Sequence, residues 1–275
     1  MTNKKYDVVA LGELLIDFTE NGLSEQGNPL LEANPGGAPC NVLSMLQKLG
    51  DKTAFIGKVG NDGFGHLLTK AVQEQGIDTT GLVYDNDVHT TLALVLKKEN
   101  GDRDFAFYRN PGADMNLKEE EVNESLIASS SIFHFGTLSL TDESVKMATQ
   151  KAVKAAKENG LTITFDPNLR EPLWRSLEEA HEQVAWGLQQ ADVVKISDNE
   201  ITWFTGMDNY DEGIAFLQKE YPNLKLICLS MGGDGSKAVY RDIHVSYPAF
   251  LQEATIETTG AGDTFCACMI HTVLE

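Results

Sequence analysis

Near the C-terminal end of the chain, six residues combine a glycine-rich turn with a carboxylate. The run Thr258-Thr259-Gly260-Ala261-Gly262-Asp263 leads into an apolar stretch that begins at Thr264. A glycine-rich turn at a helix start leaves backbone N–H groups pointing outward, and such a group of donors suits an anion. A carboxylate beside it could accept the proton of a hydroxyl that receives a phosphoryl group. The same residues also fit a plain turn with an N-cap Asp.

Three upstream positions could bind a polar ligand. In Pro35-Gly36-Gly37-Ala38-Pro39-Cys40-Asn41, two glycines permit close approach of a ligand, and Asn41 offers amide groups to hydroxyls. Asp17, expected at the exit of the first strand, could accept hydrogen bonds from vicinal hydroxyls. Arg109 follows a hairpin strand, and its guanidinium suits oxygen-rich ligands. Each position also has a structural alternative: for the glycine segment it is a loop that only leads into a helix, for Asp17 a turn residue, and for Arg109 a surface salt bridge.

Polar residues also follow three late strands. The segments are Asp166-Pro167-Asn168-Leu169-Arg170, Lys195-Ile196-Ser197-Asp198-Asn199-Glu200 and Ser230-Met231-Gly232-Gly233-Asp234-Gly235. In a parallel sheet such segments lie along one edge, where ligands bind. Asn168, Glu200 and Ser230 are suited to phosphate oxygens and to a hydrated Mg²⁺, which needs few direct protein ligands. Each segment alone fits a cap or a turn, but the clusters together favour a site.

Short apolar strands alternate with helices along the chain. We expect strands at 6–12, 53–59, 131–135, 161–165, 193–196 and 225–229. Helices are expected at 41–49, 64–75, 143–159, 177–189 and in a stretch that ends near Tyr221. This alternation predicts a mostly parallel sheet with helices on both faces.

Two segments interrupt the alternation. Residues 18–34 are polar and irregular, whereas residues 90–108 alternate around Lys98-Glu99-Asn100-Gly101, a hairpin turn. We expect the hairpin to pair with the earlier segment as a small sheet that covers a substrate site or joins two subunits; the alternative is a decorative edge hairpin. Because no repeat or linker divides the chain, we expect one domain, 1–275, with lid segments at about 15–35 and 88–112.

The composition excludes several classes of function. The 275 residues carry a net charge of −19, which repels nucleic acid and anionic membranes, and a nucleotide site would therefore need local positive charge. No apolar run approaches the roughly 20 residues of a membrane span. The four Cys lie in apolar or helical contexts, which is typical of the reducing cytoplasm. No P-loop motif is present, and Gly260-x-Gly262 is a weak Rossmann motif.

These motifs together resemble the ribokinase-like (PfkB) carbohydrate kinases over essentially the whole chain. The N-terminal signature runs from Gly36-Gly37 to Gly63-Phe64-Gly65, and the C-terminal one is the run that ends in Asp263-Thr264-Phe265. The segments 12–17, 107–114 and 165–170 are similar to the fructokinase branch. The resemblance implies a three-layer α/β/α sandwich with a small β-sheet lid, which in relatives often also forms a homodimer contact.

The resemblance also implies roles for individual residues. The reaction would be Mg·ATP-dependent phosphorylation of a sugar primary hydroxyl, with D-fructose, giving fructose 6-phosphate, as the first choice. Asp263 would be the general base, and the Gly260, Ala261 and Gly262 amides would form the anion hole. The sugar would be held by Asp17, Gly36, Gly37, Asn41 and Arg109. The nucleotide would be held by Asn168, Lys195, Ser230, Gly232 and Gly235, and Mg²⁺, through water, by Glu200.

Some features depart from the family pattern. At Ser197 the chain has Ser-x-x-Glu where many relatives have Asn-x-x-Glu. At Glu257 it has a glutamate where many relatives have Asp, in a loop that relatives associate with a monovalent cation, so K⁺ dependence is left open. The chain ends at Glu275, and we expect the elements that complete the adenine pocket to be missing. One alternative is a kinase for another substrate: 2-keto-3-deoxygluconate, whose acidic group Arg109 could bind, ribose or a nucleoside. An alternative from another class is a non-catalytic sugar-binding protein.

Overall fold

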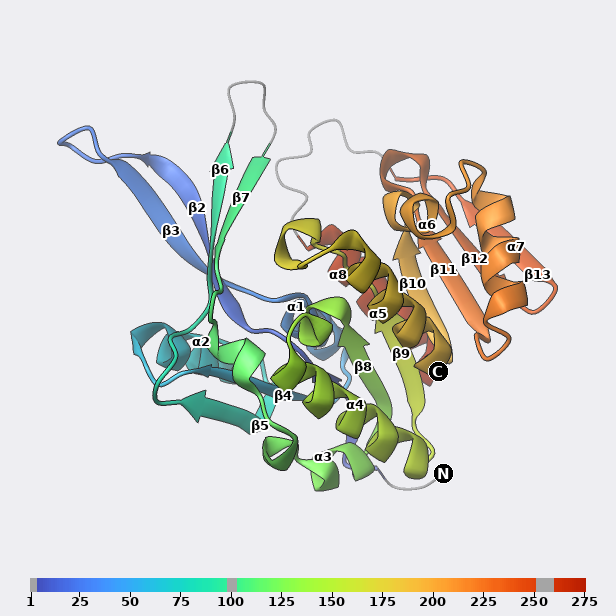
Figure 1. The fold of residues 1–275 in the computed structure, drawn as a ribbon, viewed down its shortest axis with the longest axis horizontal. Coiled ribbons are helices and arrows are strands. Elements are labelled where there is room, and N and C mark those ends of the chain that lie inside the picture. Colours follow the sequence, from blue (N-terminus) through green and yellow to red (C-terminus); the bar gives the residue numbers. More distant parts are fainter. Residues whose placement is uncertain (1–3, 98–102, 251–259) are drawn as a thin grey trace.

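The computed structural model describes residues 4–97, 103–250 and 260–275. Its largest element is a nine-stranded sheet in the order β13-β12-β11-β10-β9-β8-β1-β4-β5 (Figure 1). Neighbouring strands from β5 to β11 are parallel, and β12 and β13 add an antiparallel hairpin at one edge. The strands are β1 Tyr6–Leu11, β4 Thr53–Gly60, β5 Asp78–Asp85, β8 Ser130–Gly136, β9 Thr162–Asp166, β10 Val193–Ser197, β11 Leu226–Ser230, β12 Ser236–Tyr240 and β13 Ile243–Tyr247.

Helices cover both faces of this sheet, which confirms the expected three-layer α/β/α sandwich. Buried residues of three helices belong to one core cluster: α1 Ala38–Leu49, α2 Gly63–Glu74 and α8 Ala261–Leu274. The opposite cluster is formed by α3 Glu124–Ala128, α4 Glu143–Glu158, α5 Leu177–Gln190, α6 Asp198–Thr205 and α7 Tyr210–Glu220. None of the helices in the described ranges has the length and apolar character that crossing a membrane requires.

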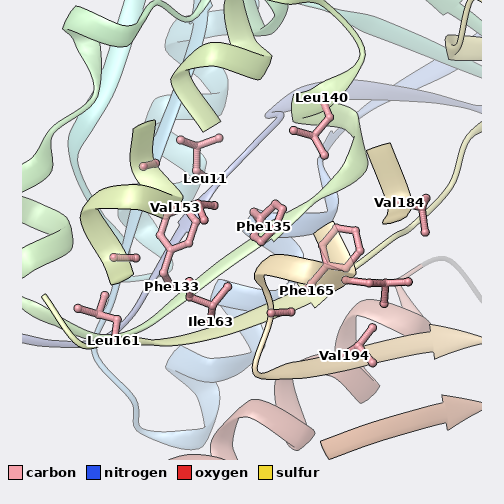
Figure 2. Close-up of a cluster of buried hydrophobic side chains, with 14 of the residues drawn as sticks. Leu11, Phe133, Phe135, Leu140, Val153, Leu161, Ile163, Phe165, Val184 and Val194 are labelled. Atoms are coloured by element: carbon pink, nitrogen blue, oxygen red, sulfur yellow. The ribbon is translucent and has the colours of Figure 1, made fainter. Parts of the chain in front are cut away.

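The central strands are apolar because both of their faces are buried. Phe133 and Phe135 on β8 and Phe165 on β9 pack together beneath α4 and α5 (Figure 2). The ring centroids of Phe135 and Phe165 lie 4.8 Å apart. Burial of one such side chain stabilises the fold by about 1.5–3 kcal/mol. The resulting rigid sheet holds the polar residues at its carboxyl edge in fixed positions.

A second sheet of four strands projects from the main body (Figure 1). Its order is β3-β2-β6-β7, with β2 Leu15–Leu23, β3 Pro29–Gly36, β6 Leu92–Lys97 and β7 Arg103–Tyr108. The expected pairing of the hairpin with the earlier segment is confirmed. The polar segment 18–34 forms most of β2 and β3 and the turn between them; most of its strand positions are exposed, which explains why it shows no apolar alternation. The turn expected at residues 98–101 lies outside the described residues.

Candidate active site

A cavity of about 290 Å³ lies where the four-stranded sheet, which we call the lid, meets the carboxyl edge of the main sheet. Its walls come from the β1–β2 segment, the start of α1, the residues after β9, β10 and the start of α8. These segments are far apart in the sequence, and the parallel sheet brings them together at one edge. The cavity is therefore the candidate ligand site.

Asp263 lies on one wall of this cavity and is 8% exposed. Its Oδ2 accepts a hydrogen bond from Asn41 Nδ2 at 2.8 Å, and its Oδ1 accepts one from Asn168 Nδ2 at 3.1 Å. The N-cap of α8 is Gly260, with φ 77°, so the alternative of an N-cap Asp is wrong. Two amides from distant elements instead hold the Asp263 carboxylate in place.

The first turn of α8 provides backbone donors beside Asp263. The Thr264 N–H donates to the Gly260 carbonyl at 2.8 Å and closes this turn. The preceding N–H groups, those of Ala261, Gly262 and Asp263, have no acceptor within the helix, as at every helix start. Because these donors and the helix dipole favour negative charge, this end of the cavity suits a phosphoryl group.

Lys195, on β10, adds a buried positive charge to the same wall. Its Nζ lies 3.1 Å from Asp166 Oδ2 and 3.3 Å from Asp166 Oδ1, and both residues are at most 5% exposed. Burial lowers the pKa of Lys195, but the carboxylates of Asp166 and Glu200 raise it by more, so the ammonium keeps its charge. A Cβ added at Gly262 would lie 3.3 Å from this Nζ, which places Lys195 against the first turn of α8.

Two carboxylates lie on the lid side of the cavity. Asp17 is half-buried on β2, and not at the exit of β1 as expected. Glu13 is 5% exposed, and its Oε1 accepts a hydrogen bond from the Ala38 N–H at 2.8 Å. Burial raises the pKa of Asp17 to about 6 and that of Glu13 to about 7. The sequence analysis missed Glu13; its position two residues beyond a buried strand could have indicated it.

The raised pKa of Glu13 predicts a pH-dependent stability. The folded protein holds a proton at pH values between the ordinary pKa of 4.5 and about 7, where the unfolded chain has released it. The free energy of unfolding therefore falls as pH rises through this window, by up to about 3 kcal/mol from Glu13. We expect Glu13→Gln to reduce the slope with which the urea-unfolding midpoint falls between pH 5 and pH 8. An unchanged slope would contradict this assignment.

The glycine pair before α1 lets the backbone pass close to these carboxylates. A Cβ at Gly36 would lie 2.1 Å from Asp17 Oδ2, and one at Gly37, where φ is 117°, would lie 2.4 Å from the Glu13 carbonyl oxygen. We expect Gly37→Ala to lower the free energy of unfolding by at least about 2 kcal/mol. Gly63→Ala is the matched control, because Gly63 starts α2 with nothing near its added Cβ. Equal unfolding midpoints for the two variants would refute the close approach.

Arg109 does not line this cavity. Its Nε donates to Asp114 Oδ2 at 2.8 Å, its NH1 to Thr141 Oγ1 at 2.8 Å and its NH2 to the Leu138 carbonyl at 2.9 Å. With the guanidinium 5% exposed and engaged on three sides, its position is that of a buried structural pair. The structure thus supports neither a sugar contact nor a surface salt bridge for Arg109.

Glu200 lies behind the site. Its Oε1 accepts from the Leu169 N–H at 2.8 Å, and its Oε2 accepts from the backbone and hydroxyl of Ser197 in a capping box at the start of α6. Both oxygens therefore hold protein groups and fix the turn after β9. Within the described ranges, no group of three or more His, Cys, Asp or Glu is placed to hold a metal ion.

Of the remaining expected residues, Asn168 lines the cavity, and the residues after β11 do not. Asn168, expected on the nucleotide side, contacts Asp263, and its φ of 46° places it in the left-handed region that Asn tolerates. Ser230, Gly232 and Gly235 lie at and beyond the end of β11 and do not line the cavity. Arg170, not expected as a site residue, does line it. Glu257, Thr258 and Thr259 lie outside the described residues.

Comparisons with known proteins show the family to which this chain belongs. The profile of the pfkB family of carbohydrate kinases matches residues 5–275. The chain is 42% identical over 271 residues to probable fructokinase-2 of Arabidopsis thaliana, covering 98% of this chain and 82% of the relative. Fructokinase-1 of Zea mays is 40% identical over 270 residues, with coverage of 98% and 83%. The crystal structure of fructokinase with bound ATP from Xylella fastidiosa matches with a TM-score of 0.88 and 28% identity, covering 98% of this chain and 81% of that one. The chain therefore belongs to the pfkB family of carbohydrate kinases.

Proposed function

We propose that this kinase transfers the γ-phosphoryl group of ATP to a primary hydroxyl of D-fructose. The observation that carries the proposal is the position of Asp263, held by Asn41 and Asn168 beside the amides of α8 and the Lys195 ammonium. A base, an anion site and a positive charge thus meet in one cavity. Fructose is the acceptor that the two fructokinase relatives suggest.

On the sugar side, Asp17 and Gly37 line the same cavity as Asp263. Asp17 can accept hydrogen bonds from hydroxyls, and the missing side chains at Gly36 and Gly37 leave room for the Asp17 carboxylate and the Glu13 backbone, so that Asp17 keeps its place at the cavity wall. Asn41 already donates to Asp263 and retains its amide oxygen for a hydroxyl. These groups orient one primary hydroxyl toward the Asp263 carboxylate.

On the phosphoryl side, the residues present fit the phosphates of ATP. The Ala261 and Gly262 amides and Lys195 would face the transferred group, and Asn168 would connect this end of the cavity to the base. Bound Mg²⁺ neutralises phosphate charge, and with no described carboxylate cluster to hold it, water and the nucleotide would supply most of its ligands. We assign Glu200 to positioning the turn after β9. A contact of Ser230, Gly232 and Gly235 with the nucleotide stays a prediction.

The chemical step balances around Asp263. The carboxylate accepts the hydroxyl proton while the sugar oxygen forms its bond to the γ-phosphorus and the bond to ADP breaks. Such a positioned base contributes about 10²–10⁴ in rate. Closure of the lid sheet over the cavity would exclude water, which is a competing acceptor.

We also propose that two copies of the chain associate through the lid. We further propose that the protein works in the reducing cytoplasm. Leu23, Leu30 and Leu31 on β2 and β3 are 44–63% exposed, which is unusual for a solvated sheet. All four cysteines are free thiols. Light scattering of the intact protein tests the dimer, and a monomeric mass at working concentration would exclude it.

A coupled assay with Mg·ATP tests the activity itself. We expect D-fructose to give the highest kcat/KM among fructose, ribose, 2-keto-3-deoxygluconate and a nucleoside. Turnover of another sugar without fructose would replace the substrate and keep the chemistry. Sugar binding in isothermal titration, with no turnover and no Mg·ATP binding, would support the non-catalytic alternative instead.

A further inference from the structure

Glu13 is a buried carboxylate for which the proposed chemistry has no use. It lines the main cavity and also a smaller one behind it, together with His134 and Asp166. The Ala38 N–H satisfies Oε1, and no salt bridge joins Glu13 to a cation in the described part of the chain. Burial of a carboxylate without a cationic partner is costly. A structural role alone would need only the contact to Ala38.

Two of the cations near the cavity, Arg109 and Lys195, are engaged by other groups. Arg109 lies behind Glu13 with its guanidinium engaged by Asp114, Thr141 and the Leu138 carbonyl. Lys195 pairs with Asp166 at 3.1 Å. Arg170 also lines the cavity; its NH1 donates to the Leu169 carbonyl at 3.1 Å, which leaves its charge uncompensated among the described residues, and this charge lowers the pKa of Asp17 against the larger effect of burial. The three carboxylates of Glu13, Asp17 and Asp263 therefore line a cavity to which, in the ranges that the structure describes, Arg170 contributes one uncompensated positive charge.

We propose that Glu13 binds a hydroxyl of the acceptor sugar and, with Asp17, makes the pocket select neutral sugars over sugar acids. This inference rests on the proposed sugar kinase function and deepens it. A hydroxyl donates well to a carboxylate, and its hydrogen bond replaces the water that Glu13 loses on burial. The carboxylate of a sugar acid would instead meet Glu13, Asp17 and Asp263, and like charges at such range repel.

The pKa of Glu13 agrees with this role. Burial raises it to about 7, so near neutral pH the group can accept a hydrogen bond from a hydroxyl or, when protonated, donate one. Gly37 packs closely against the Glu13 backbone carbonyl, which fixes the main chain there, and the Ala38 N–H holds the side-chain carboxyl at 2.8 Å. Glu13 is thus held rigidly at the cavity wall, as a specificity residue requires.

The test compares Glu13→Gln and Glu13→Ala with Asp62→Asn. Asp62 is the matched control, because its carboxylate also holds a helix start, accepting from the Gly65 N–H at 2.8 Å, and it does not line the cavity. We expect Glu13→Gln to raise the KM for fructose about 10- to 100-fold with kcat changed only a few-fold. Asp62→Asn should lower thermal stability and leave the KM unchanged.

Monodeoxy fructoses separate binding from a merely structural role. If Glu13 holds one hydroxyl, the penalty of Glu13→Gln should vanish for the analogue that lacks this hydroxyl and persist for the others. An equal penalty for every analogue, or an unchanged KM, would overturn the inference. The wild-type kcat/KM for 2-keto-3-deoxygluconate should be at least about tenfold below that for fructose, and a ratio near one would also overturn it.

The failure of the proposed function has a different signature. If the wild-type protein phosphorylates no sugar, the kinase assignment fails, and titration of fructose into wild type and Glu13→Gln still measures the contribution of Glu13. If wild type turns over fructose but Glu13→Gln matches it in KM and binding, only the inference about Glu13 fails.

Discussion

Replacement of Asp263 by Asn is expected to lower kcat for fructose phosphorylation by about 10²–10⁴. The amide has nearly the shape of the carboxylate but cannot accept the hydroxyl proton. Its oxygen can still accept from Asn41 or Asn168, which now donate to Asp263 at 2.8 and 3.1 Å, although one of the two bonds is lost. Fructose and Mg·ATP should therefore still bind with affinities close to those of wild type.

Coupled-assay kinetics and isothermal titration of both ligands measure this result. Asp198→Asn is the matched control, because Asp198 also lies in the first turn of a helix, accepts from the Asn199 N–H at 2.9 Å and is outside the cavity lining. This control should keep wild-type turnover. A kcat for Asp263→Asn within a few-fold of wild type would exclude Asp263 as the base.

Lys195→Met is expected to lower kcat by about 10²–10³, mainly at the phosphoryl-transfer step. The net charge of −19 and the carboxylates around the cavity oppose a phosphate, and Lys195 is a buried cation placed against the first turn of α8. Methionine keeps much of the volume and removes the charge. Affinity for fructose should change little, because Asp17 and Gly37 lie on the other side of Asp263.

Loss of a buried ion pair also destabilises a protein, and this effect must be separated from catalysis. Lys58→Met supplies the comparison: Lys58 is 4% exposed and pairs with Glu121 at 2.8 Å, but it does not line the cavity. We expect both variants to lose thermal stability and only Lys195→Met to lose kcat beyond its folded fraction. Equal kcat losses per folded molecule would make the role of Lys195 structural.

Much of the fold could be predicted from local patterns. Buried parallel strands need apolar residues on both faces, and this explains why the strands around Phe133, Phe165 and Val194 were recognised within a few residues. The strands β5, β12 and β13 were not expected. Strand β5 begins at the polar run Asp78-Thr79-Thr80, and all five residues of β13 are exposed, so neither carries the pattern of a buried strand.

The sequence by itself indicated that the glycine turn before Asp263 and the segment before Asn41 contribute to the cavity wall, because both lie at helix starts, which are local features. Of the small residues expected there, Gly37, Gly260 and Gly262 line the cavity, whereas Gly36 and Ala261 do not.

Only the tertiary structure decided how the long polar side chains are used. Arg109 points to Asp114, Glu200 caps α6, and Glu13 lies at the cavity. Asp114 and Ser197 lie only five and three residues from the groups they bind. In contrast, the Leu138 carbonyl that engages Arg109, the Leu169 N–H that donates to Glu200 and the Ala38 N–H that donates to Glu13 come from distant elements. A charged group takes the partners that the folded chain brings within hydrogen-bonding distance, and pattern alone does not show the distant ones. Residue type and spacing therefore predict the available chemistry, while packing decides which side chains are free to perform it.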